Sequence, residues 1–291
     1  MNDISVKALA KINLGLDVVR RREDGYHEVR MVMQTIHLFD RLEISRNDSG
    51  QITMETNLSF LPTNENNLVY KAAKLLQDEF AIKDGVHVWL HKYIPVAAGM
   101  AGGSTDAAAV LYGMNRIFEL GLTKEQLMER GVKIGADVPY CIMRGTALAE
   151  GIGEKLTKLP PMVKCPVLIA KPQISVSTKF VYENLKLNDN TIHPDIDRLV
   201  ADISEGDLIR IAADMGNVLE TVTIPEYPVI AEIKENMMQN GAVNAMMSGS
   251  GPTVFGLFAD ESTAVKAYEA MKESNLAKQV YLTSIYNNAR K

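Results

Sequence analysis

Cysteine and positive charge are both scarce in this sequence. Its 291 residues include two cysteines, Cys141 and Cys165, whose number and spacing match neither a disulfide framework nor a zinc motif. We therefore expect a reducing, cytoplasmic environment. Lysine and arginine number 31 against 36 acidic residues, and the net charge is -5. An acidic chain lacks the basic face that nucleic-acid binding requires, so we expect no nucleic-acid partner.

Long apolar runs are also missing. No run approaches the roughly 20 residues that a membrane-spanning helix needs. The first residues include Asp3 and lack both a cationic leader and a continuous apolar stretch, so they do not resemble a signal peptide. We expect a soluble protein that binds a small-molecule substrate and no membrane. The sequence gives no indication of an oligomeric state.

Length and composition predict two domains. The chain of 291 residues is longer than an ordinary single domain. The composition changes at Leu159-Pro160-Pro161, and consecutive prolines continue neither a helix nor a strand comfortably. We therefore predict one domain at residues 1–160 and a second at residues 161–291.

The first half is predicted to begin with strands. Apolar and polar residues alternate over residues 4–19 and 29–46, which predicts two strands around the turn-like Glu23-Asp24-Gly25. Helical spacing and turn residues predict the later elements. These are a helix at 67–80, a strand at 86–93, a helix at 107–120 and a helix from about 123 to 133.

The second half is predicted to mix strands and helices, so the fold class is α+β. The predicted strands are at 166–170, 242–247, 253–259 and 279–285. The predicted helices are at 178–185, 194–203, 206–219, 226–239 and 261–273.

A glycine-rich segment follows the predicted strand at 86–93. This segment, Pro95–Asp106, supplies Gly99, Gly102 and Gly103 and two hydroxyl groups immediately before a helix. Glycine lets main-chain N–H groups approach a phosphate, and a helix N-terminus adds unsatisfied donors and a favourable dipole. No lysine follows the last glycine and the spacing is not G-x-G-x-x-G, so the loop is not a Walker A loop or a dinucleotide fingerprint. The alternative is a tight strand-to-helix turn that binds no ligand.

Several side chains near these segments are candidates for chemistry. Ser104 or Thr105 either caps the helix or ligates the metal ion that accompanies ATP. The strand period places Lys11 beside Asn13 on one strand face, which is otherwise an ordinary solvated face. Asp137 follows the helix that ends near residue 133, where the next proline is expected to force extended geometry. Its carboxylate either organises that turn or accepts a proton from a substrate hydroxyl.

Metal ligands are not identified from the sequence. Two histidines four residues apart, His87 and His91, fall in a predicted strand and not in a helix, which argues against a zinc site. The segment Ser248–Gly251 is either a hairpin turn or a second loop that faces phosphate.

Taken together, these motifs resemble a known kinase superfamily. Pro95–Asp106, Gly135–Pro139 and Ser248–Pro252 are similar, in order and spacing, to three motifs of the superfamily that contains galactokinase, homoserine kinase, mevalonate kinase and phosphomevalonate kinase. The more specific stretches Ala10–Leu14, Asp24–His27 and Gly135–Pro139 resemble one branch of it, the 4-diphosphocytidyl-2-C-methyl-D-erythritol kinases. The resemblance extends over essentially the whole chain.

The resemblance implies a fold and an activity. The implied fold has a ribosomal-protein-S5-domain-2-like N-terminal domain, a ferredoxin-like C-terminal domain and an active site in the cleft between them. The implied reaction transfers the γ-phosphoryl group of ATP, accompanied by Mg²⁺, to the 2-hydroxyl group of 4-diphosphocytidyl-2-C-methyl-D-erythritol in the non-mevalonate route to isoprenoid precursors. Phosphoryl transfer depends mainly on positioning and on stabilising negative charge, which backbone donors, a metal and a lysine supply.

The resemblance also implies roles for individual residues. Asp137 matches the family's proposed base and Lys11 its charged partner, with Asn13 beside the acceptor. The cytidine-facing positions are Tyr26, His27, Thr178 and Tyr182. The ATP-binding positions are Asn67, Lys92, Pro95, Val96, Ala97, Ala98, Gly99, Met100, Ala101, Gly102, Gly103, Ser104 and Thr105. The supporting glycine loop is Ser248, Gly249, Ser250 and Gly251. Tyr182 stands where better-known members have Phe, and Lys179 replaces a common proline, so the sequence departs from the family at the cytosine wall.

Two rival functions stay open. The first is another small-molecule kinase of the superfamily, such as homoserine or mevalonate kinase, against which the Lys-x-Asn and Gly-Tyr-His stretches weigh. The second is a non-catalytic nucleotide- or RNA-binding module on the same ribosomal-protein-like fold. The acidic charge and the presence of both Lys11 and Asp137 argue against that module.

Overall fold

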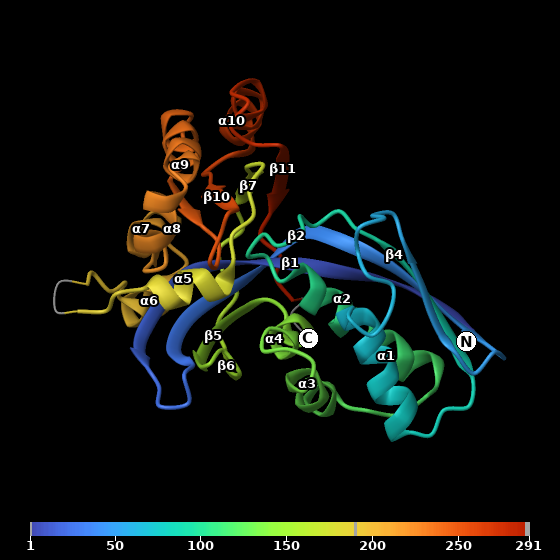
Figure 1. The fold of residues 1–291 in the computed structure, drawn as a ribbon. Helices are drawn as coiled ribbons and strands as arrows, with labels where there is room; N and C mark the ends of the chain where they lie inside the picture. The colour runs from blue at the N-terminus through green and yellow to red at the C-terminus, as the bar shows by residue number, and fades with distance from the viewer. Residues whose placement is uncertain (1, 189–190, 289–291) are drawn as a thin grey trace. The chain divides into compact units, whose positions relative to one another are not determined.

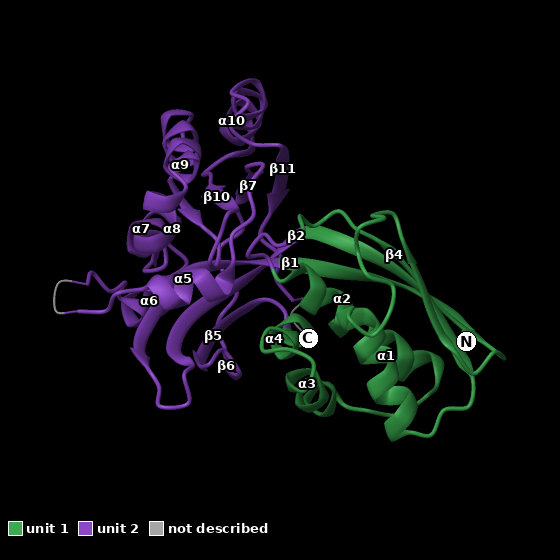
Figure 2. Cartoon of the chain, in the orientation of Figure 1, with its two compact units in different colours: residues 1–10, 38–96, 101–143 green, residues 11–37, 97–100, 144–291 purple. Residues whose placement is uncertain are grey.

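The structure, a computed structural model, describes residues 2–188 and 191–288. The chain forms two compact units (Figure 2). Unit 1 consists of residues 1–10, 38–96 and 101–143, and unit 2 consists of residues 11–37, 97–100 and 144–291. Strands and helices occur in both units, so the predicted α+β class is confirmed (Figure 1).

Two long strands contribute to both units. They are β1 (Asp3–Arg21) and β2 (His27–Asn47), which confirm the two strands predicted at the start of the chain. The turn between them contains Gly25, whose φ is +85°. The sequence alternates in polarity, yet every residue of β1 from Ala8 to Val18 is buried. The polar residues of this stretch therefore do not form a solvated face.

Unit 1 places helices beside one end of a seven-stranded sheet. The strand order there is β3-β4-β2-β1, where β3 (Ile52–Thr56) runs parallel to β4 (Gly85–His91) and β4 runs antiparallel to β2. Helix α1 (Leu68–Glu79) packs against α2 (Gly102–Ile117). The side chain of Asn67 caps α1 by accepting a hydrogen bond from Val69 N at 2.9 Å, and the predicted helix there is confirmed.

Helix α2 begins earlier than the sequence predicted, and neither Ser104 nor Thr105 caps it. The N-cap is Ala101, which has φ +56° and makes no side-chain capping bond. Thr105 instead donates its hydroxyl hydrogen to Leu9 O at 2.8 Å, so its side chain turns toward β1. The prediction failed because Gly102 and Gly103 form the first turn here, although glycine is a poor helix former.

The expectation of extended geometry at Pro139 was also wrong. Helix α3 (Lys124–Val132) ends near the predicted place, but Pro139 then lies in the first turn of a short helix, α4 (Val138–Met143). Proline is tolerated in a first turn because the N–H that it lacks would have no intrahelical partner there. Asp137 therefore immediately precedes a helix, and its carbonyl accepts a hydrogen bond from Cys141 N at 3.0 Å.

Unit 2 contains the remaining strands of the seven-stranded sheet and a separate four-stranded sheet. In the seven-stranded sheet, β5 (Thr146–Gly151) pairs with β2 and with β6 (Lys155–Lys158), and β8 (Gly216–Asn217) pairs with β1. The four-stranded sheet has the order β11-β7-β10-β9. Its strands are β7 (Pro166–Lys171), β9 (Asn244–Met247), β10 (Val254–Leu257) and β11 (Gln279–Ser284).

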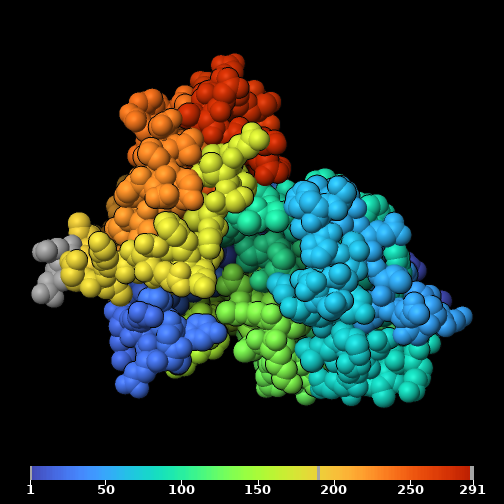
Figure 3. Space-filling model, in the orientation of Figure 1, coloured from blue at the N-terminus to red at the C-terminus, as the bar shows by residue number. Residues whose placement is uncertain are grey.

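The helices of unit 2 confirm most of the predicted pattern. They are α5 (Thr178–Asn184), α6 (Ile196–Glu205), α7 (Leu208–Asp214), α8 (Glu220–Glu226), α9 (Val229–Gln239) and α10 (Glu261–Glu273). Helix α9 packs on β9 and β10, and α10 packs on β7 and β11. Both helices lie at the surface of unit 2, in orange and red in Figure 3.

The helix predicted at 206–219 is shorter in the structure. It ends at Asp214 as α7, because Gly216 and Asn217 pair with Gly15 and Leu16 of β1 to form β8. A two-residue strand has no period for a sequence pattern to reveal. No helix in the described part of the chain is long and apolar enough to cross a membrane.

Candidate active site

Lys11 is buried, and its ammonium group is held by two neutral oxygens of unit 2. Lys11 Nζ donates to Asn13 Oδ1 at 2.7 Å and to Gly99 O at 2.9 Å. The strand period places Lys11 and Asn13 on one face of β1, as predicted. Lys11 is 5% exposed, which rules out the ordinary solvated face. A buried ammonium with fixed partners is preorganised for contact with an anion.

The two glycine loops touch at Gly99. Ser248 Oγ donates to Gly99 O at 3.0 Å, so this carbonyl accepts hydrogen bonds from both Lys11 and the second loop. A Cβ atom on Gly99, whose φ is +71°, would lie 2.1 Å from Ser248 O. A Cβ atom on Gly249 would lie 3.2 Å from Gly99 O. Glycine is therefore required at position 99 for the loops to approach each other.

The first glycine loop has an unusual backbone. Ala97, Gly99 and Ala101 have φ values of 50°, 71° and 56°, all in the left-handed region. The first-turn N–H groups of α2 that follow have no intrahelical partners, which makes them donors for an anion. Gly103 is exposed, and the nearest atom to a Cβ built on it is Leu68 Cδ1 at 3.6 Å. This helix start is therefore open to a ligand.

Three of the residues predicted to face the cytidine make side-chain contacts within unit 2. The rings of His27 and Tyr182 lie 5.1 Å apart with an interplanar angle of 40°. The hydroxyl groups of Thr178 and Ser250 are hydrogen bonded at 2.8 Å, which ties α5 to the second glycine loop. Tyr26 is 62% exposed in the turn before β2. Burial, aided by the charge of Arg21, lowers the pKa of His27, so its imidazole is neutral near pH 7.

The predicted base and the predicted adenosine residues belong to unit 1. Asp137 is half-buried at the start of α4. Asn67 donates to Pro62 O at 2.8 Å in addition to capping α1, so both ends of its amide are engaged. The ATP roles of Asn67 and Lys92 stay predictions.

Lys92 has an observed role in a buried charge cluster that the sequence did not reveal. Its ammonium donates to Asp106 Oδ2 at 2.8 Å and to Asp40 Oδ2. Burial lowers the pKa of Lys92, but the charges of Asp106 and Asp40 outweigh it and the net shift is upward. Burial raises the pKa of Asp106 well above its ordinary value, against the lowering effect of Lys92. Asp40 Oδ1 accepts from Tyr93 N and Ile94 N at 2.6 and 2.8 Å and so holds the segment that follows β4.

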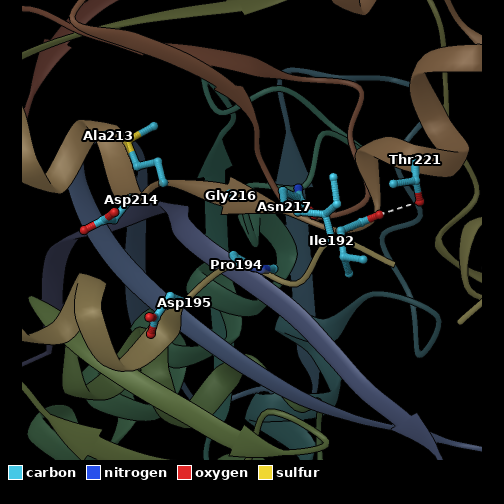
Figure 4. Close-up of a pocket in the computed structure, with 10 residues that line it drawn as sticks. Ile192, Pro194, Asp195, Ala213, Asp214, Gly216, Asn217 and Thr221 are labelled. Carbon is cyan, nitrogen blue, oxygen red and sulfur yellow. Dashed lines mark hydrogen bonds between the residues drawn. The ribbon is translucent and has the colours of Figure 1, made fainter. Parts of the chain in front are cut away.

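A pocket of about 310 Å³ lies elsewhere in unit 2, beside β8 (Figure 4). Its lining includes the apolar residues Ile192, Pro194 and Val218 and the acidic residues Asp195 and Asp214. Its wall also includes an asparagine at position 217, which the sequence reasoning missed. The signal that was available was a short Gly-Asn pair that interrupts a helical pattern.

Comparison with known proteins gives matches over both halves of the chain. The family model described as GHMP kinases N terminal domain matches residues 67–145, and the model described as GHMP kinases C terminal matches residues 199–277. A curated relative from Lachnospira eligens, 4-diphosphocytidyl-2-C-methyl-D-erythritol kinase, is 58% identical over 286 residues, which cover 98% of this chain and 99% of the relative.

Solved structures share the fold. A crystal structure of 4-(cytidine 5'-diphospho)-2C-methyl-D-erythritol kinase has a TM-score of 0.85 at 30% identity and covers 98% of this chain and 100% of that chain. Homoserine kinase from Cytophaga hutchinsonii has a TM-score of 0.82 at 20% identity and covers 99% of this chain and 96% of that chain. The second match shows the fold alone, so fold similarity does not separate the possible substrates. The implied α+β kinase fold is confirmed, and the sequence identity shows that the chain belongs to the 4-diphosphocytidyl-2-C-methyl-D-erythritol kinase family of the GHMP kinases.

Proposed function

We propose that this chain transfers the γ-phosphoryl group of ATP to the 2-hydroxyl group of 4-diphosphocytidyl-2-C-methyl-D-erythritol, in the non-mevalonate route to isoprenoid precursors. The observation that carries the proposal is the meeting of three motifs in unit 2. Lys11 and Asn13 of β1, Gly99 of the first glycine loop, and Ser248 and Gly249 of the second lie in direct contact. Family membership supports this choice of substrate, because the relative at 58% identity carries that kinase name.

The proposed reaction uses fixed charge and one proton acceptor. Lys11 faces the transferring phosphoryl group, where its positive charge stabilises the negative charge that spreads over the phosphoryl oxygens. Asp137 orients the 2-hydroxyl group or accepts its proton as the new P–O bond forms and the bond to ADP breaks. The N–H groups at the start of α2 hold the ATP phosphates. Asn13 lies beside the acceptor alcohol.

Mg²⁺ is proposed to enter with ATP. Within residues 2–188 and 191–288, no cluster of three His, Cys, Asp or Glu side chains forms a site for a resident metal. A magnesium ion held by substrate phosphates and water needs only one or two protein ligands. The hydroxyl of Ser104, in the first turn of α2, fits that need better than the hydroxyl of Thr105, which is buried and bonded to Leu9 O.

Tyr26, His27, Thr178 and Tyr182 are together called the substrate wall. We propose that this wall recognises cytosine by shape and by neutral polar groups. The rings of His27 and Tyr182 present faces and edges to a base, and base stacking on an aromatic ring contributes about 1–3 kcal/mol. A neutral imidazole offers one donor and one acceptor, which suits a pyrimidine edge that carries both kinds of group. Thr178 supplies a hydroxyl, and Tyr26 closes the wall from the β1–β2 turn.

The cytoplasmic location and the domain division at residues 160 and 161 are further parts of the proposal. Both cysteines are buried, and burial raises the pKa of Cys165 to about 12. A thiol with so high a pKa is unreactive near neutral pH.

The test is an assay that couples ADP release to a panel of alcohols. The panel contains 4-diphosphocytidyl-2-C-methyl-D-erythritol, homoserine, mevalonate and galactose. We expect ADP release to depend on the cytidine substrate, with phosphorus NMR placing the new phosphate on the 2-hydroxyl. Faster turnover of homoserine or mevalonate would assign the chain to another kinase of the superfamily. Nucleotide binding without ADP release for any alcohol would favour the non-catalytic module.

A further inference from the structure

The second glycine loop leaves the edge of a sheet. Strand β9 lies at one end of the order β11-β7-β10-β9, and Met247 is its last residue. The backbone groups on the outer side of an edge strand need partners other than a strand. The loop from Ser248 to Gly251 begins immediately after Met247, so whatever holds Met247 also sets the position of the loop.

Two side chains, three positions apart, hold Met247 from that outer side. Asn217 Nδ2 donates to Met247 O at 2.9 Å and to Gly249 O at 2.8 Å. Glu220 Oε1 accepts from Met247 N at 2.8 Å. Both backbone groups of Met247 are therefore satisfied, and the first glycine of the loop is fastened as well.

The two side chains are themselves fixed. Asn217 Oδ1 accepts from Leu219 N at 3.0 Å, and the side chain is buried, so its amide has one orientation that satisfies all its partners. Glu220 Oε2 accepts from Lys234 Nζ at 2.5 Å, which anchors the carboxylate to α9. The pair forms a rigid clamp between β8, the start of α8 and the loop.

The clamp is connected to Lys11 by short contacts. Asn217 fixes Gly249, which packs against Gly99, and Ser248 donates to Gly99 O. The same carbonyl accepts from Lys11 Nζ. A displacement of the second loop by a few tenths of an ångström therefore moves an oxygen that orients Lys11.

We propose that Asn217 and Glu220 are positioning residues of the phosphoryl-transfer site, which act through the second glycine loop and Gly99 on Lys11. The inference deepens the proposed function and rests on it. Neither side chain touches the reactants, and each acts by fixing the backbone that holds the lysine ammonium. Misplacement of a reacting group by about 1 Å can lower a rate by about a hundredfold, so a loose clamp reduces kcat.

The first experiment compares Asn217→Asp with Asn244→Asp. Asn244 is a matched control because its side-chain amide also fastens β9, by donating to Ala212 O and accepting from Ala245 N, but at the end away from the loop. The substitution at position 217 would place one carboxylate oxygen against two carbonyl oxygens. We expect faster amide hydrogen exchange over residues 247–252 and a kcat lower by about tenfold or more for Asn217→Asp, and neither change for Asn244→Asp.

Two further variants guard against misfolding and against a purely structural role. Asn217→Ala removes the donors without adding charge and is expected to give the same exchange and kcat effects. Glu220→Gln keeps an oxygen for Met247 N and is expected to retain kcat within about threefold. Glu220→Ala removes that oxygen and is expected to lower kcat. Equal kcat for all variants, with changes only in unfolding free energy, would overturn the proposal.

A double-mutant cycle tests whether the clamp acts through Lys11. In a Lys11→Ala background the ammonium is absent, so Asn217→Asp is expected to lower kcat by no more than about threefold further. A loss equal to the product of the two single losses would show that Asn217 acts independently of Lys11. Hydrogen exchange needs no substrate, so an inactive wild-type protein would reject the proposed function while the exchange result still decides whether the clamp fixes the loop.

Discussion

Lys11 and Lys92 are two buried lysines with different surroundings. They are 5% and 7% exposed, and each ammonium has fixed hydrogen-bond acceptors. Lys92 donates to the carboxylates of Asp40 and Asp106, which join strands and a helix of unit 1. Lys11 donates to the neutral oxygens of Asn13 and Gly99, which belong to sequence motifs.

This difference in acceptors distinguishes a lysine that serves the structure from a lysine of the candidate active site. The acidic groups of Asp40 and Asp106 compensate the ammonium of Lys92 inside the protein, and removing the lysine leaves buried acidic groups without a cation. Asn13 Oδ1 and Gly99 O are uncharged acceptors, so these two hydrogen bonds orient the ammonium group of Lys11 without adding negative charge. Burial alone therefore does not identify a catalytic lysine, and the type of acceptor carries more information.

The largest expected effect is a loss of stability in Lys92→Met. This variant leaves Asp40 and Asp106 facing each other without a cation, so we expect the free energy of unfolding to fall by about 3–5 kcal/mol in urea denaturation. Lys74→Met is the control, since Lys74 pairs with Asp78 on the exposed face of α1 and should cost less than about 1 kcal/mol. Equal losses for the two variants would contradict a structural role for Lys92. A raised KM for ATP in the folded fraction of Lys92→Met would support the predicted role of Lys92 near the adenosine of ATP.

Lys11→Ala should affect catalysis and not stability. We expect a much smaller change in the unfolding transition than Lys92→Met causes. Loss of a fixed positive charge at the transferring group is expected to lower kcat by about a hundredfold or more. Asp137→Asn is expected to lower kcat on a similar scale, through the loss of a proton acceptor. Steady-state kinetics check both variants, and losses below about threefold in both would return these residues to ordinary structural roles.

Gly103→Val tests the proposed phosphate site at the start of α2. Because Gly103 is exposed and has no close neighbour, valine should fit the fold while its side chain blocks the N–H groups of α2. We expect ATP affinity, measured by calorimetry, to fall by about tenfold or more with circular dichroism unchanged. Gly99→Ala is the contrasting variant, in which the 2.1 Å approach to Ser248 O disturbs the loops themselves. Unchanged ATP affinity in folded Gly103→Val would reject the phosphate role of this loop.

Tyr182→Ala probes the proposed substrate wall of unit 2, the unit that also contains Lys11. Loss of base stacking is expected to raise KM for the cytidine substrate by about tenfold to a hundredfold and to leave KM for ATP nearly unchanged. Tyr182→Phe should be nearly neutral because stacking uses the ring face. A lower melting temperature with an unaltered KM for the cytidine substrate would instead make Tyr182 a packing residue.

The smallest expected effect is a change of pH dependence in Asp106→Asn. The folded protein holds a proton on Asp106 above the ordinary pKa of about 3.9, so its contribution to stability is fully present below that pH and is lost as pH rises through the raised pKa. Asp106→Asn should flatten this decline and change stability at neutral pH by less than about 1 kcal/mol. Urea denaturation from pH 5 to 8 measures the slope. Asp260→Asn should keep the wild-type slope there, because the pKa of Asp260 is lowered to about 2. An unchanged slope in Asp106→Asn would show that Asp106 is charged in the folded protein.

Periodic patterns predicted most elements, while contacts between distant segments escaped them. The alternation in β1 placed Lys11 beside Asn13, and Asn67 was found at the start of a helix. The contact between Gly99 and Ser248 joins residues 149 positions apart, and no local pattern encodes it. Asp40 belongs to the cluster around Lys92 for the same kind of reason, since its partner is 52 positions away.

Short elements were missed because they carry too little sequence. The strand β8 has two residues, and its role depends on the pairing of Gly216 and Asn217 with β1. At Pro139, a rule about the residue before proline was outweighed by the tolerance of proline in a first helical turn. Of the candidate site, the sequence predicted the residues of unit 2 that meet at Lys11, but not the clamp that fixes them.

The left-handed residues at positions 97, 99 and 101 alternate with residues of ordinary backbone conformation. Successive peptides that alternate in hand form a nest, a concavity in which main-chain N–H groups converge on an anion. Such an anion site depends on the backbone torsion angles and not on side-chain chemistry. Replacing Ala97 or Ala101 with Gly or Asn should therefore preserve it, and replacing either with a β-branched residue should not. Searches for distant relatives of this loop should therefore score the spacing of positions that tolerate a left-handed backbone, and not the identities of the residues at those positions.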